Sequence, residues 1–327
     1  MPLTGRPIRD SRLILLAGPT AVGKSEVVLA LAEKLGGEII SVDSMQVYRG
    51  LDIGTAKPAR VELERVPHHL IDVVDLTESF DAAQFVGLAR DAVEEIRSRE
   101  RVPILCGGTG LYFKAFLEGL GQAPSADAAL RAELEAMPLP DLLAELATKD
   151  PMTYETIDRQ NPRRVIRAVE VIRLTGKPYS QQRANWSGPA STHERGRGAT
   201  CAIAERCLFI GLTRSSTDLG RRIDMRVEEM FRRGLVAETV ELLKHGLAEN
   251  RTAMQALGYR QVVEHLRGAR SLAETIELVK IRTRQFAKRQ MTWFKKYGAW
   301  QWTNLNSDES AGVTAKGLIE RAQKEAF

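Results

Sequence analysis

An eight-residue segment, Gly18 to Ser25, constrains the fold of this chain more than any other feature. It reads Gly-Pro-Thr-Ala-Val-Gly-Lys-Ser and fits the pattern Gly-x-x-x-x-Gly-Lys-Ser/Thr at every position. The apolar run Leu13 to Ala17 precedes it, and apolar residues at helical spacing follow from Lys24 to Leu35. We therefore expect a buried parallel strand, a tight loop and a helix, in that order.

Such a loop is a binding site for phosphate groups. Glycines let backbone N–H groups approach phosphate oxygens closely, and the N-terminus of the following helix attracts the same anion. Lys24 adds a positive charge, and the hydroxyl of Ser25 is a ligand for Mg²⁺. From these residues alone we expect a bound diphosphate or polyphosphate, with a nucleotide as the commonest occupant.

The rest of the chain predicts an α/β fold, a P-loop NTPase-like parallel sheet flanked by helices. Further strands are expected at residues 38–42, 70–74, 102–106 and 207–212. A helix is expected from Asp81 to Arg99, with its inward face formed by Phe85, Leu88, Ala89, Ala92, Val93 and Ile96. Alternating strands and helices favour a sheet covered on both faces.

A helical insertion is expected in the middle of the chain. Residues 123–183 contain six prolines that divide a helical pattern into short pieces, and few strand candidates. The α/β core would then comprise residues 8–122 and 205–327, with mostly helical residues after the last predicted strand. Residues 187–199, rich in Gly, Ser and Arg, are expected to form a loop, and residues 304–327 a polar helical tail.

Composition excludes several classes of protein. The three cysteines form no Cys-x-x-Cys pair, and the five histidines form no zinc pattern. The first residues contain no apolar signal segment, and no apolar run is long enough to span a bilayer. We therefore expect a cytoplasmic enzyme without a membrane segment. A monomer is expected as well, although the composition does not determine the oligomeric state. The net charge of +5 is too small to indicate a nucleic-acid partner by itself.

Asp43 follows the predicted strand 38–42 and is a candidate catalytic residue. An acidic side chain at the end of such a strand can ligate Mg²⁺ or accept a proton from a substrate. The residue types alone leave these two roles equally open. The segments around and beyond it are more specific, namely Asp43-Ser-Met-Gln-Val-Tyr-Arg49, Ile53–Pro58, Val66–Asp72, Gly107-Gly-Thr-Gly-Leu-Tyr112, Gln160-Asn-Pro-Arg-Arg164, Leu257–Arg260 and Gln285–Gln290.

Together with the phosphate loop, these segments resemble the tRNA dimethylallyltransferase family over most of the chain. The resemblance implies transfer of a dimethylallyl group from dimethylallyl diphosphate to N6 of the adenine 3′ of the anticodon, position 37 of the tRNA. Diphosphate would be the leaving group. It would be held by the loop residues Gly18, Pro19, Thr20, Ala21, Val22, Gly23, Lys24 and Ser25, with Mg²⁺ on Ser25.

The resemblance also implies roles for individual residues. Asp43 would accept the proton of the adenine amine, and Thr109 would contact the reacting groups. Lys24 and Arg222 would face the diphosphate, with Arg222 preferred over Arg226 for that role. Cys106 is expected to be a buried thiol without catalytic function. His68 and His69 are expected to be structural, because the reaction requires no imidazole.

A second group of residues would bind the anticodon stem-loop of tRNA. It consists of Asp43, Ser44, Met45, Gln46, Thr109, Arg131, Gln160, Asn161, Pro162, Arg163, Arg164, Gly258, Tyr259, Arg260, Arg284, Lys288 and Arg289. The segment Lys280–Lys296 is strongly basic and contains interleaved aromatic residues. Those aromatics either stack on an exposed base or pack into a core, and their spacing permits both.

Three other functions remain open from the sequence. A small-molecule kinase would place ATP on the phosphate loop, but the segments after Asp43 and at 160–164 would have no explanation. A related prenyltransferase acting on free adenine nucleotides would share the loop and Asp43 but would need no basic C-terminal helices. A non-enzymatic RNA-binding protein would not need Lys24, Ser25, Asp43 and Thr109 together.

Overall fold

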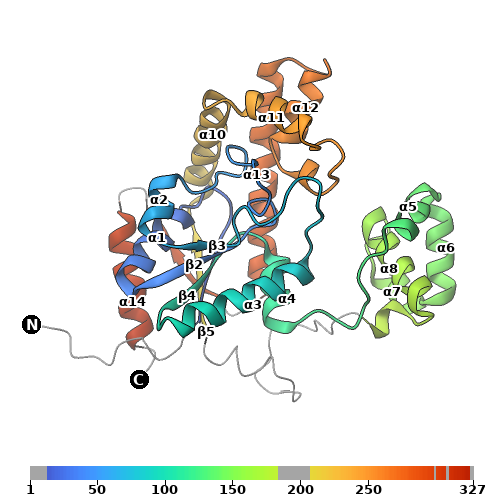
Figure 1. The fold of residues 1–327 in the computed structure, drawn as a ribbon, viewed down its shortest axis with the longest axis horizontal. Helices are drawn as coiled ribbons and strands as arrows, with labels where there is room; N and C mark the ends of the chain where they lie inside the picture. Colours follow the sequence, from blue (N-terminus) through green and yellow to red (C-terminus); the bar gives the residue numbers. More distant parts are fainter. Residues whose placement is uncertain (1–12, 183–206, 298–299, 307–308, 325–327) are drawn as a thin grey trace, which may run out of the picture. The chain divides into compact units, whose positions relative to one another are not determined.

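The computed structural model describes residues 13–182, 207–297, 300–306 and 309–324, and these divide into two compact units (Figure 1). The first unit contains the chain up to Leu117 and from Gly188 onward, and the second contains Glu118–Ser187. The expected insertion, 123–204, overlaps the second unit, and its predicted end lies outside the described residues, as does the predicted loop 187–199.

The first unit is built on a six-stranded parallel sheet. Its strand order is β3-β2-β4-β1-β5-β6. The strands are β1 (Leu13–Ala17), β2 (Gly37–Val42), β3 (His68–His69), β4 (Val102–Gly107), β5 (Cys207–Thr213) and β6 (Gln301–Asn304). The central strand β1 is buried at every residue, as a strand covered on both faces must be. The predicted α/β class is therefore confirmed.

Side chains of β1 alternate between two hydrophobic clusters. Leu13, Leu15 and Ala17 belong to one cluster, and Ile14 and Leu16 belong to the other. The second cluster includes residues of α1 (Lys24–Leu35) and α14 (Ala311–Lys324), and the first includes residues of α3 (Ala82–Ser98), α4 (Gly110–Glu118), α11 (Leu235–Lys244), α12 (Tyr259–Leu266) and α13 (Leu272–Lys296). The sheet thus has helices on both faces.

The described part of the first unit contains two further helices. Helix α2 (Arg60–Arg65) precedes β3, and α10 (Ser216–Arg232) follows β5 and packs on α13 through Ile223, Val227, Val279 and Ala287. A single 3₁₀ turn, η2 (Ala253–Gln255), precedes α12. Within the described part of the chain, no helix combines the length and the apolar character needed to cross a bilayer.

Two local predictions were wrong. The strand expected at 70–74 lies instead at His68–His69, because Leu70 and Asp72 adopt positive φ angles of 62° and 54° that bend the chain out of the extended conformation. The side chain of Leu88 was expected inside but is 39% exposed, whereas the neighbouring Val86 is buried. Helix α3 is therefore rotated slightly from the face that its apolar spacing predicted.

The second unit is a small helical bundle with its own apolar cluster. Its helices are α5 (Ala128–Ala136), α6 (Leu139–Lys149), α7 (Pro151–Thr156), α8 (Pro162–Thr175) and the 3₁₀ turn η1 (Tyr179–Gln181). Helices α6, α7 and α8 carry a proline within their first turn, where the missing N–H costs nothing. The prolines that divided the sequence pattern therefore mark helix starts.

Candidate functional site

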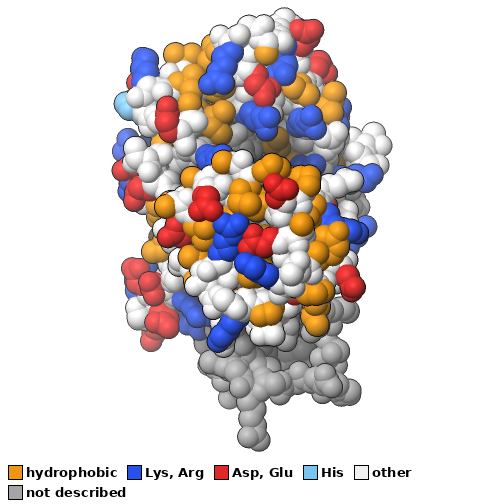
Figure 2. Space-filling model, turned by 90° about the vertical axis from the view of Figure 1, so that its right-hand side faces the viewer, with side chains coloured by type: hydrophobic (Ala, Val, Ile, Leu, Met, Phe, Trp, Pro, Cys, Tyr) orange, Lys and Arg blue, Asp and Glu red, His pale blue; other side chains and the backbone are white. Residues whose placement is uncertain are grey.

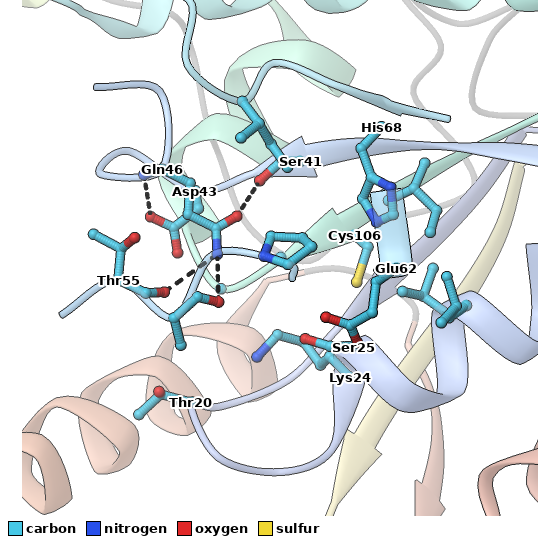
Figure 3. A pocket seen from close by; sticks show the side chains of 18 of the residues that line it. Thr20, Lys24, Ser25, Ser41, Asp43, Gln46, Thr55, Glu62, His68 and Cys106 are labelled. Atoms are coloured by element: carbon cyan, nitrogen blue, oxygen red, sulfur yellow. Dashed lines mark hydrogen bonds between the residues drawn. The ribbon is translucent and has the colours of Figure 1, made fainter. Parts of the chain in front are cut away.

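Three loops meet at the carboxyl ends of neighbouring parallel strands. The phosphate loop follows β1, Asp43 follows β2, and Gly108 and Thr109 follow β4. In a parallel sheet these ends lie along one edge, where ligands commonly bind. A cavity opens there, and Figure 3 shows Lys24 and Ser25 on one side of it and Asp43, Gln46 and Thr55 on another. The residues predicted for donor binding and for proton transfer are thus brought together.

The phosphate loop has the conformation that its glycines allow. Gly23 adopts a φ of 107°, and α1 begins at the next residue. The ammonium of Lys24 donates to the carbonyl oxygens of Gly18 at 3.0 Å and of Pro19 at 2.8 Å. Burial lowers the pKa of Lys24 to about 8. Because a desolvated ammonium gains most from an anionic partner, the loop is suited to receive a phosphate group at this position.

Asp43 is held in place through one of its two oxygens. Its Oδ1 accepts hydrogen bonds from the backbone N–H groups of Met45, at 2.8 Å, and Gln46, at 3.3 Å. Oδ2 has no hydrogen-bond partner among the described residues, and the side chain lines the cavity. The carboxylate is therefore oriented by its own turn and keeps one oxygen available to a substrate.

Gln46 joins Asp43 to the opposite wall of the cavity. Its side chain accepts from the hydroxyl of Ser41 at 2.8 Å and donates to the carbonyl oxygens of Thr55 and Ala56 at 3.2 and 3.3 Å (Figure 3). Gln46 lines the cavity as expected of a substrate contact, while its amide is also a structural link. Ser44 and Met45 do not line the cavity.

Thr109 lies beside the cavity without lining it. Its Oγ1 accepts a hydrogen bond from the backbone N–H of Ser44 at 3.2 Å, and its own N–H donates to the carbonyl oxygen of Val42 at 3.2 Å. Thr109 therefore ties the loop after β4 to the loop after β2. The hydroxyl retains its proton as a donor for a substrate atom.

Two arginines of α10 approach the phosphate loop from different sides. Arg222 lines a neighbouring pocket, where its Nε donates to the carbonyl oxygen of Ala21 at 3.0 Å. Arg226 lines both that pocket and the cavity that contains Lys24 and Asp43. Burial lowers the pKa of Arg226, and the charge of Asp43 opposes this shift. Arg226 is therefore closer to the reacting groups than its second rank in the sequence analysis suggested.

Helix α13 contributes two cavity residues that sequence reasoning did not assign. Phe286 and Gln290 both line the cavity, although they lie far from the phosphate loop in the sequence. Of the aromatic residues considered for base stacking, Phe294 is buried and packs edge-to-face on Phe113 and Trp300. For that residue the core interpretation of the aromatic pattern holds. Phe286 and Gln290 both belong to the family-like segment Gln285–Gln290, but neither was among the predicted site residues.

Two residues predicted to contact tRNA are buried. Tyr259 is 0% exposed; its hydroxyl donates to Glu238 at 2.6 Å and accepts from the N–H of Gly54 at 3.0 Å. Gly258 is also buried, at a φ of 97°. In this structure the atoms of this pair are used inside the core, and direct contact with tRNA stays a prediction. Arg260 is exposed and pairs with Glu264 at 3.0 Å.

The basic residues predicted on α13 are exposed. Arg284 forms an ion pair with Asp224. Lys288 and Arg289 take part in no ion pair with a described residue, and the guanidinium of Arg289 lies 5.9 Å from the ring centre of Phe286. These two cations are available to an anionic partner.

The predicted contacts in the second unit differ in their surroundings. Arg131 donates to Glu170 at 2.5 Å, and Asn161 caps α8 by accepting from the N–H of Arg164. Pro162 is the first residue of that helix. Gln160, Arg163 and Arg164 are exposed. Asn161 is thus committed to the helix start, whereas its neighbours present polar groups at the surface.

His68, His69 and Cys106 have structural surroundings. The Nε2 atom of His69 lies 2.7 Å from Glu38, and Nδ1 of His68 lies 2.7 Å from the carbonyl oxygen of Val66. Burial lowers the pKa of His68 and raises that of the Cys106 thiol to about 12, which keeps both groups uncharged at neutral pH. Cys106 and His68 line the cavity as neutral side chains.

Charges of both signs are distributed over the surface. On the face drawn in Figure 2, basic and acidic side chains lie side by side, with hydrophobic atoms between them. A small net charge of +5 agrees with this mixture. On this face, attraction of a polyanion would therefore depend on particular cations rather than on one uniform basic field.

Comparisons with known proteins support a single family. A family model described as "IPP transferase" matches residues 46–297. A curated relative from Geotalea uraniireducens, "tRNA dimethylallyltransferase 2", is 43% identical over 94% of this chain and 96% of its own length. A "tRNA dimethylallyltransferase" from Desulforudis audaxviator is also 43% identical, over 96% of this chain and 98% of its own length.

Solved structures give the same result. A full-length tRNA isopentenylpyrophosphate transferase from Bacillus halodurans is 37% identical, with a TM-score of 0.66 over 97% of this chain and 100% of that one. A eukaryotic dimethylallyltransferase acting on tRNA is 27% identical, with a TM-score of 0.70 over 96% of this chain and 77% of that one. The chain belongs to the IPP transferase family, the family of the tRNA dimethylallyltransferases.

Proposed function

We propose that this chain transfers a dimethylallyl group from dimethylallyl diphosphate to N6 of adenine 37, the base 3′ of the anticodon in tRNA. The observation that carries the proposal is one cavity in which Lys24 and Ser25 of a phosphate loop face Asp43. A kinase also needs a phosphate loop, but the relatives of this chain are named as tRNA dimethylallyltransferases over nearly its whole length.

The reaction exchanges one bond for another at the allylic carbon. The adenine N6 lone pair forms a new C–N bond, and the C–O bond to the diphosphate breaks, so the diphosphate leaves with both bonding electrons. The amine must also lose a proton. Oδ2 of Asp43, which accepts no hydrogen bond from a described residue, is the acceptor that we assign to this proton, and such a base contributes about 10²–10⁴-fold to a rate.

Charge develops on the departing diphosphate, and cations must face it. Lys24 is buried within the loop, and Arg226 lines the same cavity. Arg222 donates to the carbonyl oxygen of Ala21 in the phosphate loop and lines the neighbouring pocket. We assign Lys24 and Arg226 to direct contact with the leaving group and Arg222 to the outer side of the loop.

The donor atoms of the site fit Mg²⁺. Among the described residues no cluster of three or more acidic, His or Cys side chains is able to hold a metal alone. Ser25 would supply a hydroxyl oxygen at the start of α1, and a bound diphosphate and water would supply the other oxygen ligands, the type of ligand that Mg²⁺ prefers. When bound, the ion would neutralise charge on the leaving group.

Both units contribute to binding the tRNA in this proposal. Lys288 and Arg289 on α13, Arg260 on α12, and Arg163 and Arg164 on α8 present exposed cations to phosphate groups. The target adenine lies in a loop, so unstacking it costs only a few kcal/mol. We propose that the enzyme acts as a monomer. We place the enzyme in the cytoplasm, where its acceptor is found.

Radiolabelled dimethylallyl diphosphate provides the test. The enzyme is incubated with Mg²⁺ and either tRNA or AMP, and label in the acceptor is counted. We expect label in tRNA and a loss of at least 100-fold in kcat for Asp43→Ala. Label in AMP but not tRNA would favour the prenyltransferase of free nucleotides. Turnover of ATP on a small metabolite, without transfer to tRNA, would replace the proposal with a kinase.

A further inference from the structure

One face of α13 is directed at the catalytic loops. Phe286, Gln290, Trp293 and Phe294 share this face because they are spaced at four, seven and eight residues along the helix. The first two line the cavity, and Phe294 belongs to the hydrophobic core of the first unit. Lys288 and Arg289 lie between them in sequence and are exposed. The helix therefore has one catalytic face and one cationic surface.

Gln290 makes two hydrogen bonds to two different loops. Its Oε1 accepts from the backbone N–H of Thr20 in the phosphate loop at 2.8 Å. Its Nε2 donates to the carbonyl oxygen of Gly108, the residue before Thr109, at 3.0 Å. The side chain is 8% exposed, so both bonds are shielded from water. Among uncharged side chains only an amide has an acceptor and an N–H donor on adjacent branches.

The glycines of the second loop are shaped around α13. A Cβ atom on Gly108 would lie 2.3 Å from Nε2 of Gln290, and one on Gly110 would lie 2.2 Å from the indole of Trp293. Neither glycine has a positive φ angle, so backbone conformation does not require glycine at either position. Glycine is required at both positions because α13 occupies the space that a side chain would need. The Gly-Gly-Thr-Gly segment and the C-terminal half of α13 therefore fit together as one unit of structure.

We propose that Gln290 is a positioning residue for the transfer reaction, which holds the phosphate loop and the Thr109 loop at a fixed separation. The inference rests on the proposed function, in which the first loop binds the diphosphate and the second borders the reacting groups. Gln290 acts through Thr20 and Gly108. Without it, the allylic carbon and the adenine amine are less often aligned, and a displacement of 1 Å can cost as much as 100-fold in rate.

Two substitutions separate the hydrogen bonds from the packing. Gln290→Met keeps the length of the side chain and removes both bonds. Gln290→Glu keeps the acceptor for Thr20 but places a negative charge against the carbonyl oxygen of Gly108. Gln285→Met is the matched control, because Gln285 lies on the same helix, is exposed and does not line the cavity. We measure kcat, and KM for each substrate, with labelled dimethylallyl diphosphate and tRNA.

We expect kcat to fall at least fivefold in both variants at position 290, while KM for tRNA changes less than threefold. The control should keep all three constants within twofold of the wild type. A smaller fall in kcat, or a loss confined to KM for tRNA, overturns the proposal. The second result would instead make Gln290 part of the tRNA surface of α13.

A double-mutant cycle tests the contact itself. Gly108→Ala places a methyl group where the amide lies, so it should lower kcat at least fivefold as well. In Gly108→Ala/Gln290→Ala the methyl group has room. The kcat of the double variant should therefore be no more than twofold below that of the worse single variant, Gly108→Ala or Gln290→Ala. If the loss of kcat in the double variant equalled the product of the two single losses, the two sites would act independently, and the proposal would be overturned. Gly108→Ala also replaces the variants at 290 if these do not fold.

Binding of diphosphate separates this inference from the proposed function. Calorimetry with inorganic diphosphate and Mg²⁺ needs neither tRNA nor transfer. We expect Gln290→Met, which removes the bond to Thr20 without adding a charge, to bind diphosphate at least fivefold more weakly than the wild type, because the phosphate loop is displaced. Unchanged binding together with unchanged kcat overturns the role of Gln290. A wild-type enzyme that binds diphosphate but labels no tRNA overturns the proposed function instead.

Discussion

Helices α8 and α13 have similar surfaces and different buried faces. Both present exposed arginines, and both were predicted to bind tRNA. The buried polar group of α8 is Glu170, which accepts from Arg131, Arg167 and the N–H of Asp127 inside the second unit. The buried amide of α13 is Gln290, which bonds to two catalytic loops. The buried face, rather than the surface charge, shows which helix is connected to the chemistry.

The largest expected effect is a loss of stability when the buried carboxylate of α8, Glu170, is removed. In Glu170→Gln, Arg131 and Arg167 lose their shared carboxylate, which is 0% exposed. Removing one partner of a buried ion pair typically costs 3–5 kcal/mol; we expect about 3 kcal/mol, because both arginines are partly exposed. Urea unfolding measures the loss. If the comparison holds, the KM for the donor stays within twofold. A raised donor KM would connect α8 to the catalytic loops.

The next effect concerns Tyr259, which is the first residue of α12 and is also buried. Tyr259→Phe removes the hydroxyl that joins Glu238 to the N–H of Gly54. We expect a loss of about 1–3 kcal/mol in unfolding free energy, because the N–H loses its partner. Arg260→Ala, one residue away and exposed, is the control and should keep its stability. A raised KM for tRNA in Tyr259→Phe, with unchanged stability, would support the original contact prediction.

Single cations on α8 should have smaller effects. Arg163→Ala and Arg164→Ala each remove one exposed charge, and we expect KM for tRNA to rise about 3–10-fold with little change for the donor. The logarithmic dependence of tRNA affinity on salt should weaken by about 0.7–0.9 for each phosphate contact that is lost. Filter binding at several salt concentrations measures the slope. Equal changes in both KM values would contradict a role limited to tRNA.

The smallest expected effect is a difference in how far the Tm falls at acid pH. Burial raises the pKa of Asp150 in the second unit, but hydrogen bonds from Thr153 and Ser180 outweigh it, so the net shift is downward. Its stabilisation is complete above the unfolded pKa, about 3.9, and is lost as the pH falls through the lower folded value. Between pH 5 and pH 3 the Tm of the wild type should therefore fall about 2–4 °C more than that of Asp150→Asn. If the Tm of the wild type and of Asp150→Asn fell by the same amount between pH 5 and pH 3, this prediction would be wrong.

Local features of the fold were predictable from the sequence. The strand Leu13–Ala17 and the helix Lys24–Leu35 have the predicted bounds, because a short apolar run and a glycine-rich turn leave few alternatives. The position of β3 was not predictable, since positive φ angles at Leu70 and Asp72 carry no clear mark in the sequence. Leu88 was misplaced because an apolar side chain at helical spacing can still lie at the edge of a buried face.

Contacts between distant parts of the chain account for most of the site that sequence analysis missed. Gln290 is 270 residues from Thr20 and 182 from Gly108, and Tyr259 is 205 from Gly54. Periodicity reports which face of a helix is buried, but it does not identify the partner. Asp43, Lys24 and Thr109 were found because their motifs are local. Arg226 was ranked second because one helical turn separates it from Arg222, and only the fold decides which faces the cavity.

The position of α14 has a consequence for the order of biosynthesis. This helix buries Ala315 and Leu318 in the same cluster as Val27, Val28 and Leu31 of α1, the helix that follows the phosphate loop. A ribosome makes α1 early and α14 long afterwards. Until α14 emerges, one apolar side of α1 has no cover in the nascent chain. A polypeptide stalled before residue 311 should therefore recruit chaperones that bind exposed apolar helices.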